Sequence, residues 1–163
     1  MTEINMDGYV VLVDDEDVER VKQRQWYIKD NPKINTPYCY TWDYDGTTKK
    51  VTHTSMHRFI LRVTDGAQIV DHIDHNGLNN CKGNLRICSM MENIWNQQKP
   101  RDNTSGYKGV SYRDGKWIVR IMKNYVSYYL GAYDDIENAA MAYDIGAMYL
   151  HGKYSATNFD KAT

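Results

Sequence analysis

An aspartate and a histidine, Asp71 and His72, stand side by side at the end of a short apolar run, residues 68–70. The Asp71 carboxylate is a hard oxygen donor of the kind that Mg²⁺ or Mn²⁺ prefers. A neutral His72 imidazole can take a proton from water, because the usual pKa of histidine lies near neutrality. A cation and a base of this kind are what phosphodiester hydrolysis requires, so the pair is a candidate catalytic centre.

Two asparagines further along the chain could complete that centre. Asn84 begins a second short strand and could orient the histidine. Asn93 falls in the early turns of a helix whose start matches a capping box, formed by Ser89 and Glu92. The carbonyl oxygen of Asn93 could join the aspartate on the cation. The sequence therefore predicts a strand–turn–strand–helix unit over residues 69–98.

Three strands and one helix are expected before this unit, and a linker after it. Apolar and polar residues alternate over residues 9–13, 37–42 and 50–53, which predicts strands, and acidic residues crowd the start of a helix expected near 15–26. Residues 99–106 contain a proline and several small polar residues, which favours a linker. We therefore expect two domains, residues 1–98 and 107–163.

Three strands and then a helix are predicted after the linker, with the strands over residues 107–113, 116–123 and 126–133. Asp134 and Glu137 match the start of a helix, and Gly152 would end it. Apolar residues at helical spacing mark one face: Ile136, Ala139, Ala140, Tyr143, Ala147 and Leu150. The fold class is therefore expected to be α+β, ending in a three-stranded antiparallel sheet packed on one helix.

Strand alternation sorts the side chains of this sheet into two faces. The set expected to face the helix is Val110, Tyr112, Trp117, Val119, Ile121, Tyr128 and Leu130. The set expected to face outward is Lys108, Ser111, Arg113, Arg120, Met122 and Tyr129. Residues 99–130 hold seven Lys and Arg against two Asp and Glu, a net charge of +5, whereas residues 1–98 hold 11 against 14. The outward set is thus a candidate surface for phosphate, although a solvated basic face has the same composition.

Composition narrows the class of protein. An apolar fraction of 42%, with 14 tyrosines, supports a folded core. Cys39, Cys81 and Cys88 include no C-x-x-C pair, which argues against a disulfide framework and a four-thiolate zinc site. No apolar run approaches the ~20 residues of a membrane span, and the start lacks the pattern of a signal peptide. We expect a soluble, cytoplasmic protein with no membrane partner and no small-molecule cofactor.

Residues 70–93 read V-D-H-I-D-H-N-G-L-N-N-C-K-G-N-L-R-I-C-S-M-M-E-N, and this pattern resembles the core of the HNH endonucleases, the ββα-metal fold of phage homing enzymes. The resemblance implies that His72 is the general base and Asp71 the first metal ligand. It implies that Asn84 holds the base and that Asn93 takes the place of the last histidine. Oxygen donors in place of imidazole favour Mg²⁺, or Mn²⁺, over zinc or nickel.

Neighbouring residues of the same resemblance are given structural roles. Asn79 and Asn80 resemble loop asparagines that pin the turn through bonds to the backbone. Residues 56–59 resemble a segment that precedes the nuclease core in phage HNH proteins, and we expect its His57 and Arg58 to be structural. His75 is expected to serve the loop rather than catalysis.

The segment 103–159 carries the motifs Y-K-G-V-S, G-K-W, Y-L-G-A-Y, A-A-M-A-Y-D and G-K-Y-S-A-T-N-F, and it resembles the Apetala-two DNA-binding domain of plant ethylene-response factors. That domain also occurs fused to HNH nucleases. The resemblance implies that the sheet enters the major groove while the helix supports its back. Ser111, Met122, Ser127 and Tyr129 replace arginines and a tryptophan of the plant domains, so the plant target sequence does not carry over.

These observations favour a site-directed, metal-dependent DNA endonuclease or nickase of the phage or mobile-element homing type. Its partner would be double-stranded DNA, and it would act as a monomer rather than a dimer, in the host cytoplasm if a phage encodes it. Two alternatives stay open: a DNA-binding regulator with an inactive HNH core, and an RNA-binding protein whose tyrosines stack on bases.

Overall fold

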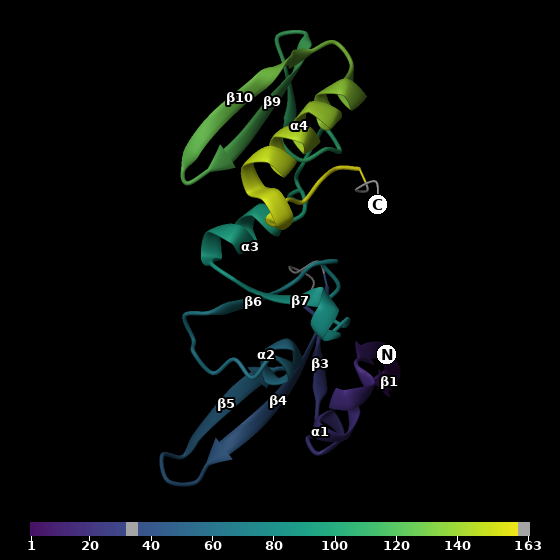
Figure 1. The fold of residues 1–163 in the computed structure, drawn as a ribbon, viewed down its shortest axis with the longest axis vertical. Coiled ribbons are helices and arrows are strands. Elements are labelled where there is room, and N and C mark those ends of the chain that lie inside the picture. Colours follow the sequence, from purple (N-terminus) through teal and green to yellow (C-terminus); the bar gives the residue numbers. More distant parts are fainter. Residues whose placement is uncertain (32–35, 160–163) are drawn as a thin grey trace. The chain divides into compact units, whose positions relative to one another are not determined.

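A computed structural model describes residues 1–31 and 36–159 and divides into two compact units, Met1–Ser89 and Met90–Thr163 (Figure 1). Both units combine small antiparallel sheets with short helices, so the expected α+β class is confirmed at this level. Within the described residues no helix is long and apolar enough to cross a membrane.

The N-terminal unit begins with a hairpin that the sequence analysis missed in part. Strands β1 (Thr2–Met6) and β2 (Tyr9–Val13) pair in antiparallel fashion, with Met6 opposite Tyr9 across the turn. The helical segment expected near 15–26 is shorter, because it consists of the 3₁₀ turn η1 (Asp15–Asp17) and the helix α1 (Val18–Lys22). Acidic residues fill its first turn as expected.

Two further sheets complete this unit. The first has the order β3-β4-β5 and the second pairs β6 with β7, and both are antiparallel. A short helix, α2, follows β5 directly and was not predicted. The bounds are β3 (Tyr27–Lys29), β4 (Tyr38–Asp45), β5 (Lys50–Ser55), α2 (Met56–Ile60), β6 (Ile69–His72), η2 (Lys82–Asn84) and β7 (Leu85–Cys88).

One apolar core holds these small elements together. Its fully buried members include Val11 and Val13 of β2 and Met56 and Ile60 of α2. The middle of β2 also fixes the loop between β6 and β7, because the Leu12 amide donates to Leu78 O at 2.9 Å and Leu12 O accepts from the Asn80 amide at 2.8 Å. The N-terminal hairpin therefore braces the loop that follows the Asp71–His72 pair.

The C-terminal unit is a three-stranded antiparallel sheet, in the order β10-β9-β8, packed on the helix α4. The apolar stripe predicted for this helix is confirmed, since its four central members are buried and Ile136 and Leu150 pack against them. The bounds are α3 (Met90–Asn96), β8 (Val110–Arg113), β9 (Lys116–Lys123), β10 (Val126–Tyr133), α4 (Ile136–His151) and η3 (Gly152–Tyr154).

Two details of this unit differ from expectation. The α4 N-cap is Asp135, not Asp134, because the Asp135 carboxylate accepts from the Asn138 amide at 2.8 Å. Tyr112 and Tyr128 share the inner face by register with Trp117 and Ile121, yet they are 62% and 41% exposed. The alternation of residues along the strands predicted the correct face of the sheet for both tyrosines. It could not show that α4 leaves the two side chains uncovered.

Gly109 lets the sheet and α4 approach closely. Its φ is +74°, and a Cβ there would lie 2.0 Å from the Tyr143 ring and 2.8 Å from Arg120 O. Tyr143 is buried on α4, and the Arg120 amide donates back to Gly109 O at 3.0 Å. No residue with a side chain fits this position without moving the helix or the strand.

Helix α3 packs with the C-terminal unit. The Trp95 ring stacks on His151 of α4, with ring centroids 4.6 Å apart and planes 1° from parallel. The Lys108 ammonium donates to Trp95 O at 2.9 Å and also to Gln97 O. The compact units thus divide at Ser89, before α3, whereas the composition of residues 99–106 predicts a boundary after this helix.

Candidate active site and nucleic-acid interface

Strand β6 carries the two residues of the candidate catalytic centre. Asp71 lies opposite Arg86 of β7, and His72 lies opposite Leu85. The Asp71 Oδ2 atom accepts from Arg86 Nε at 2.9 Å and from Nη2 at 2.7 Å, and both side chains are largely buried. This ion pair was not predicted from the sequence. The sequence contains a hint of it, because oppositely charged residues at equal distances from the loop of a hairpin lie opposite each other on the two strands.

The His72 imidazole is enclosed by side chains from three other segments. Its Nε2 lies 3.4 Å from Asn80 Oδ1, and its ring centroid is 5.0 Å from that of His57 and 5.6 Å from that of Tyr38. Only 4% of His72 is exposed. Burial lowers the pKa of His72, and this is opposed by the Asn80 contact and by the charges of Asp74 and Asp71. The imidazole is therefore neutral, the form that accepts a proton, at neutral pH.

Asn80, rather than Asn84, is the asparagine that the structure brings to His72. The Asn84 side chain instead braces the loop between β6 and β7: it donates to Asp74 Oδ1 and Asn79 O, both at 2.8 Å, and accepts from the Asp74 amide at 3.1 Å. Asn80 is completely buried. The adjacent asparagines of this polar loop gave no signal that separated the two roles.

Asp74 is the centre of that loop network. Partial burial raises the pKa of Asp74, but hydrogen bonds from the Asn76 amide and from Asn79 and Asn84 outweigh it and hold the pKa below its usual value. His75 follows with a left-handed backbone, φ 64°, and its amide donates to His72 O at 3.2 Å. This geometry agrees with a loop role for His75.

His57 and Arg58 of α2 both make structural contacts. The His57 Nε2 atom lies 2.9 Å from Ser55 Oγ, and burial lowers the pKa of His57 to about 3. The Arg58 guanidinium donates to Gln68 O and Asp65 O, each at 2.6 Å. Arg58 therefore fastens the segment that leads into β6, and His57 forms part of the wall around His72.

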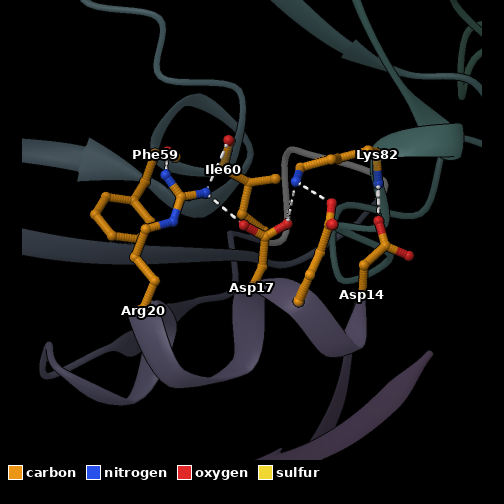
Figure 2. A network of polar contacts seen from close by, with 7 residues as sticks. Asp14, Asp17, Arg20, Phe59, Ile60 and Lys82 are labelled. Atoms are coloured by element: carbon orange, nitrogen blue, oxygen red, sulfur yellow. Dashed lines mark hydrogen bonds and ion pairs between the residues drawn. The ribbon is translucent and has the colours of Figure 1, made fainter.

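A network of acidic and basic side chains holds the far end of the same loop (Figure 2). The Lys82 amide donates to Asp14 Oδ2 at 2.7 Å, and the Lys82 ammonium contacts Glu16 and lies 2.9 Å from Asp17 Oδ2. Asp17, only 4% exposed, also accepts from Arg20 at 2.6 Å. Lys82 immediately precedes the Gly83–Asn84 turn, so this network positions the loop from the N-terminal helical segment.

The expected metal ligands belong to different compact units. Asp71 lies in the first unit and Asn93, on α3, in the second. Their oxygen donors suit Mg²⁺, but one Asp71 oxygen already accepts two bonds from Arg86. Across residues 1–31 and 36–159, no three His, Cys, Asp or Glu side chains are grouped so that they could hold a metal ion. The ligand assignment therefore stays a prediction from the sequence.

Five of the six residues expected to face DNA lie exposed on one side of the C-terminal sheet. They are Ser111, Arg113, Arg120, Met122 and Tyr129. The register pairs Arg120 with Tyr129, and Arg113 forms an exposed ion pair with Asp114 at 3.3 Å. A bulge between Tyr129 and Gly131 leaves this outward set intact. The five side chains thus lie exposed on one face of the sheet, as alternation predicted.

Lys108, the sixth residue, has a different position. Its ammonium lies on the carbonyls at the end of α3, and burial lowers the pKa of Lys108 to about 8. Its backbone is held on both sides by Asn158, whose Oδ1 accepts from the Lys108 amide at 2.6 Å. Lys108 therefore ties α3 to the sheet, a role that strand alternation could not show.

Comparison with known proteins gives partial matches to two kinds of protein, and no family model matches the chain. An uncharacterized HNH endonuclease of Acanthamoeba polyphaga mimivirus is 32% identical over 108 residues, which is 63% of this chain and 56% of the viral protein. Protein 3.8 of Escherichia phage T7 is 51% identical over 43 residues, which is 26% of this chain and 36% of the phage protein.

Further matches are to plant proteins, several of them named as ethylene-responsive transcription factors. An ethylene-responsive transcription factor of Arabidopsis thaliana is 40% identical over 55 residues, which is 32% of this chain and 29% of the plant protein. The chain spans about half the length of the mimivirus protein and about a third of the phage and Arabidopsis proteins. It therefore shares partial homology with an HNH endonuclease and, more locally, with proteins of the ethylene-response-factor type.

Proposed function

We propose that this protein is a DNA endonuclease or nickase that hydrolyses phosphodiester bonds with His72 as general base, and that it is of the phage or mobile-element homing type. The observation that carries the proposal is the buried, neutral imidazole of His72, the residue that follows Asp71 on β6. The match to a viral HNH endonuclease supports nuclease activity at a coarse level.

The chain's own side chains divide the work of the proposed reaction. His72 accepts a proton from the attacking water, and Asn80 and the His57 ring hold the imidazole in place. Asn84 keeps the loop closed around this base through Asp74. Arg86 holds the Asp71 carboxylate in a fixed orientation.

The proposal includes a divalent cation, Mg²⁺ or Mn²⁺, with Asp71 as a ligand and Asn93 as the second oxygen donor predicted from the sequence. Bound there, the cation would stabilise negative charge that develops on the phosphate. Loss of either ligand should therefore raise the cation concentration that the protein needs. Calorimetry with Mn²⁺ in the absence of DNA measures cation binding by the wild type and by the Asp71→Ala variant. This comparison checks the ligand assignment without reference to activity.

Double-stranded DNA is the proposed substrate, bound by the outward face of the C-terminal sheet. Support comes from the exposed Arg113 and Arg120 side chains and from the matches to plant transcription factors. A single base acts on one strand at a time, so a monomer should nick a duplex before it cuts the second strand.

Incubation of the protein with supercoiled plasmid, with and without Mg²⁺, tests the proposed function. We expect conversion to open circles only with the cation, and linear product later. A protein that binds the plasmid but never nicks it, with Mg²⁺ or Mn²⁺, would instead be a DNA-binding regulator with an inactive core. Binding to RNA in preference to duplex DNA would contradict both.

A further inference from the structure

A groove on the N-terminal unit has no role in the activity proposed above. Two open hollows, of about 580 and 530 Å³, share Arg20, Arg24, Asp43 and Phe59 along their walls. The second hollow adds Arg58 and Arg62. We call this continuous surface, defined by Arg20, Arg24, Asp43, Arg58, Phe59 and Arg62, the arginine groove.

The charge of the arginine groove is opposite to that of the chain around it. Four arginines and one aspartate line the groove, and with the Asp17 carboxylate that pairs with Arg20 the formal net charge is +2. Residues 1–98 as a whole hold 11 basic side chains against 14 acidic ones. Positive charge is thus concentrated in a hollow of an otherwise acidic region, and the ligand that matches it is an anion.

Two of the arginines are fixed against one aromatic ring. The Arg20 guanidinium lies 4.8 Å from the centre of the Phe59 ring, donates to Phe59 O and Ile60 O, and pairs with the Asp17 carboxylate at 2.6 Å (Figure 2). The Arg24 guanidinium lies 5.0 Å from the same ring and donates to both oxygens of Asp43 at 2.8 Å. These side chains are already ordered, so an anion that binds them costs little further side-chain entropy.

The other two arginines have charge to spare. Arg58 donates to neutral backbone carbonyls, so no carboxylate offsets its positive charge there. Arg62 is exposed, and within the described part of the chain no carboxylate pairs with it. Thr54 and Thr64 add hydroxyl groups to the same hollow. Arginines combined with hydroxyls are the groups that proteins use to bind the phosphates of a nucleic-acid backbone.

We propose that the arginine groove binds the phosphodiester backbone of duplex DNA, as a second DNA contact besides the C-terminal sheet. This inference rests on the proposal that the protein acts on DNA, but not on which residues perform catalysis. An open groove with cations along its walls fits a continuous strand of phosphates, which needs no enclosed pocket for a base. The contact would be independent of sequence and would hold the N-terminal unit on the duplex.

The test measures binding of the full-length protein to a short labelled duplex of random sequence, in EDTA so that no cleavage occurs, over a series of salt concentrations. Arg62→Ala is the main variant, because this exposed side chain can be removed without disturbing the fold. Arg24→Ala combined with Arg62→Ala extends the series. Lys29→Ala is the matched control, since Lys29 is an exposed cation of the same unit outside the groove.

We expect Arg62→Ala to weaken duplex binding several-fold and to reduce the slope of log affinity against log salt by about one, as for the loss of one phosphate contact. The double variant should lose about twice as much slope, and Lys29→Ala should match the wild type. Groove variants that bind like Lys29→Ala would overturn the groove while leaving DNA binding intact. A loss seen with single-stranded but not duplex DNA would overturn the choice of duplex. A wild-type protein that binds no duplex would refute the proposed function itself.

Discussion

The two units hold their candidate functional residues in opposite ways. In the N-terminal unit, His72 and Asp71 are buried and contact side chains that are distant in the sequence, such as His57 and Arg86. In the C-terminal unit, Arg113, Arg120 and their neighbours are exposed and are placed by strand register alone. Buried polar groups need partners, because an unsatisfied one is costly, whereas exposed ones are satisfied by water.

This difference separates what a substitution can change in each unit. Altering a buried partner in the N-terminal unit should change chemistry or folding, since several side chains depend on each other there. Altering an exposed residue of the C-terminal sheet should change only affinity. The predictions below test that division, beginning with the largest effect.

Substitution of the proposed base should have the largest effect. His72→Ala removes the proton acceptor but no exposed phosphate contact, so we expect cleavage to fall by roughly 100-fold or more with nearly unchanged DNA affinity. A plasmid nicking assay and a gel-shift assay measure the two quantities. His75→Ala, in the same loop, is the control and should nick at close to the wild-type rate. Wild-type cleavage by His72→Ala would sink the assignment.

A buried contact also exists in the C-terminal unit, and breaking it should cost stability there. Gly109→Ala places a methyl group against the Tyr143 ring at a positive φ, so we expect a loss of about 2–4 kcal/mol in the free energy of unfolding. Gly115→Ala shares a positive φ, +80°, but has open space around it, and should cost about 1–2 kcal/mol. Urea unfolding of both variants provides the comparison. Equal losses of unfolding free energy in the two variants would show that Gly109 is not required for the close approach of α4 to the sheet.

The exposed arginines should affect binding without affecting folding. Arg113→Ala and Arg120→Ala should each weaken binding to a specific site by about 1–3 kcal/mol if they reach base edges. Their unfolding midpoints should equal that of the wild type. Competition between target and random duplexes measures the discrimination, and an unchanged ratio would mean that both side chains meet phosphates or solvent instead.

Acid should weaken the N-terminal unit through His57, one of two histidines whose pKa is lowered by burial. Burial lowers the pKa of His57 from 6.5 to about 3, so the unfolded chain binds a proton in this window and the folded chain does not. The stability present above pH 6.5 is therefore lost as the pH falls toward 3, by up to about 1.4 kcal/mol per pH unit. His57→Phe keeps a ring beside His72 and removes this proton. The free energy of unfolding, measured with urea, should differ less between pH 5 and pH 7 in this variant than in the wild type. An equal difference in the two proteins would contradict the prediction.

The sequence predicted the C-terminal unit in more detail than the N-terminal one. Strands β9 and β10 have the predicted bounds, and the buried stripe of α4 was found from its spacing. Such features depend on local periodicity, which one sequence contains. Strand alternation predicted the face of the sheet on which Tyr112 lies. It could not predict that this side chain is exposed, because exposure depends on which part of the sheet α4 covers.

In the N-terminal unit the chemistry was predicted but its partners were not. Asp71 and His72 lie on the expected strand, yet His57 and Tyr38, which enclose His72, come from other segments of the chain. The polar loop between β6 and β7 contains four asparagines, Asn76, Asn79, Asn80 and Asn84, and so offers several equivalent candidates. Only tertiary packing distinguishes them.

The stacking of Trp95 on His151 determines where this chain could be recombined with another. A crossover placed in residues 99–106, at the apparent linker, would leave the His151 ring without its partner and the Lys108 ammonium without the carbonyls that it binds. A crossover at Ser89, before α3, would transfer the helix together with the sheet that holds it. Exchange of the C-terminal unit between proteins would then carry residues 90–106 along as an inherited part, even though their composition looks dispensable.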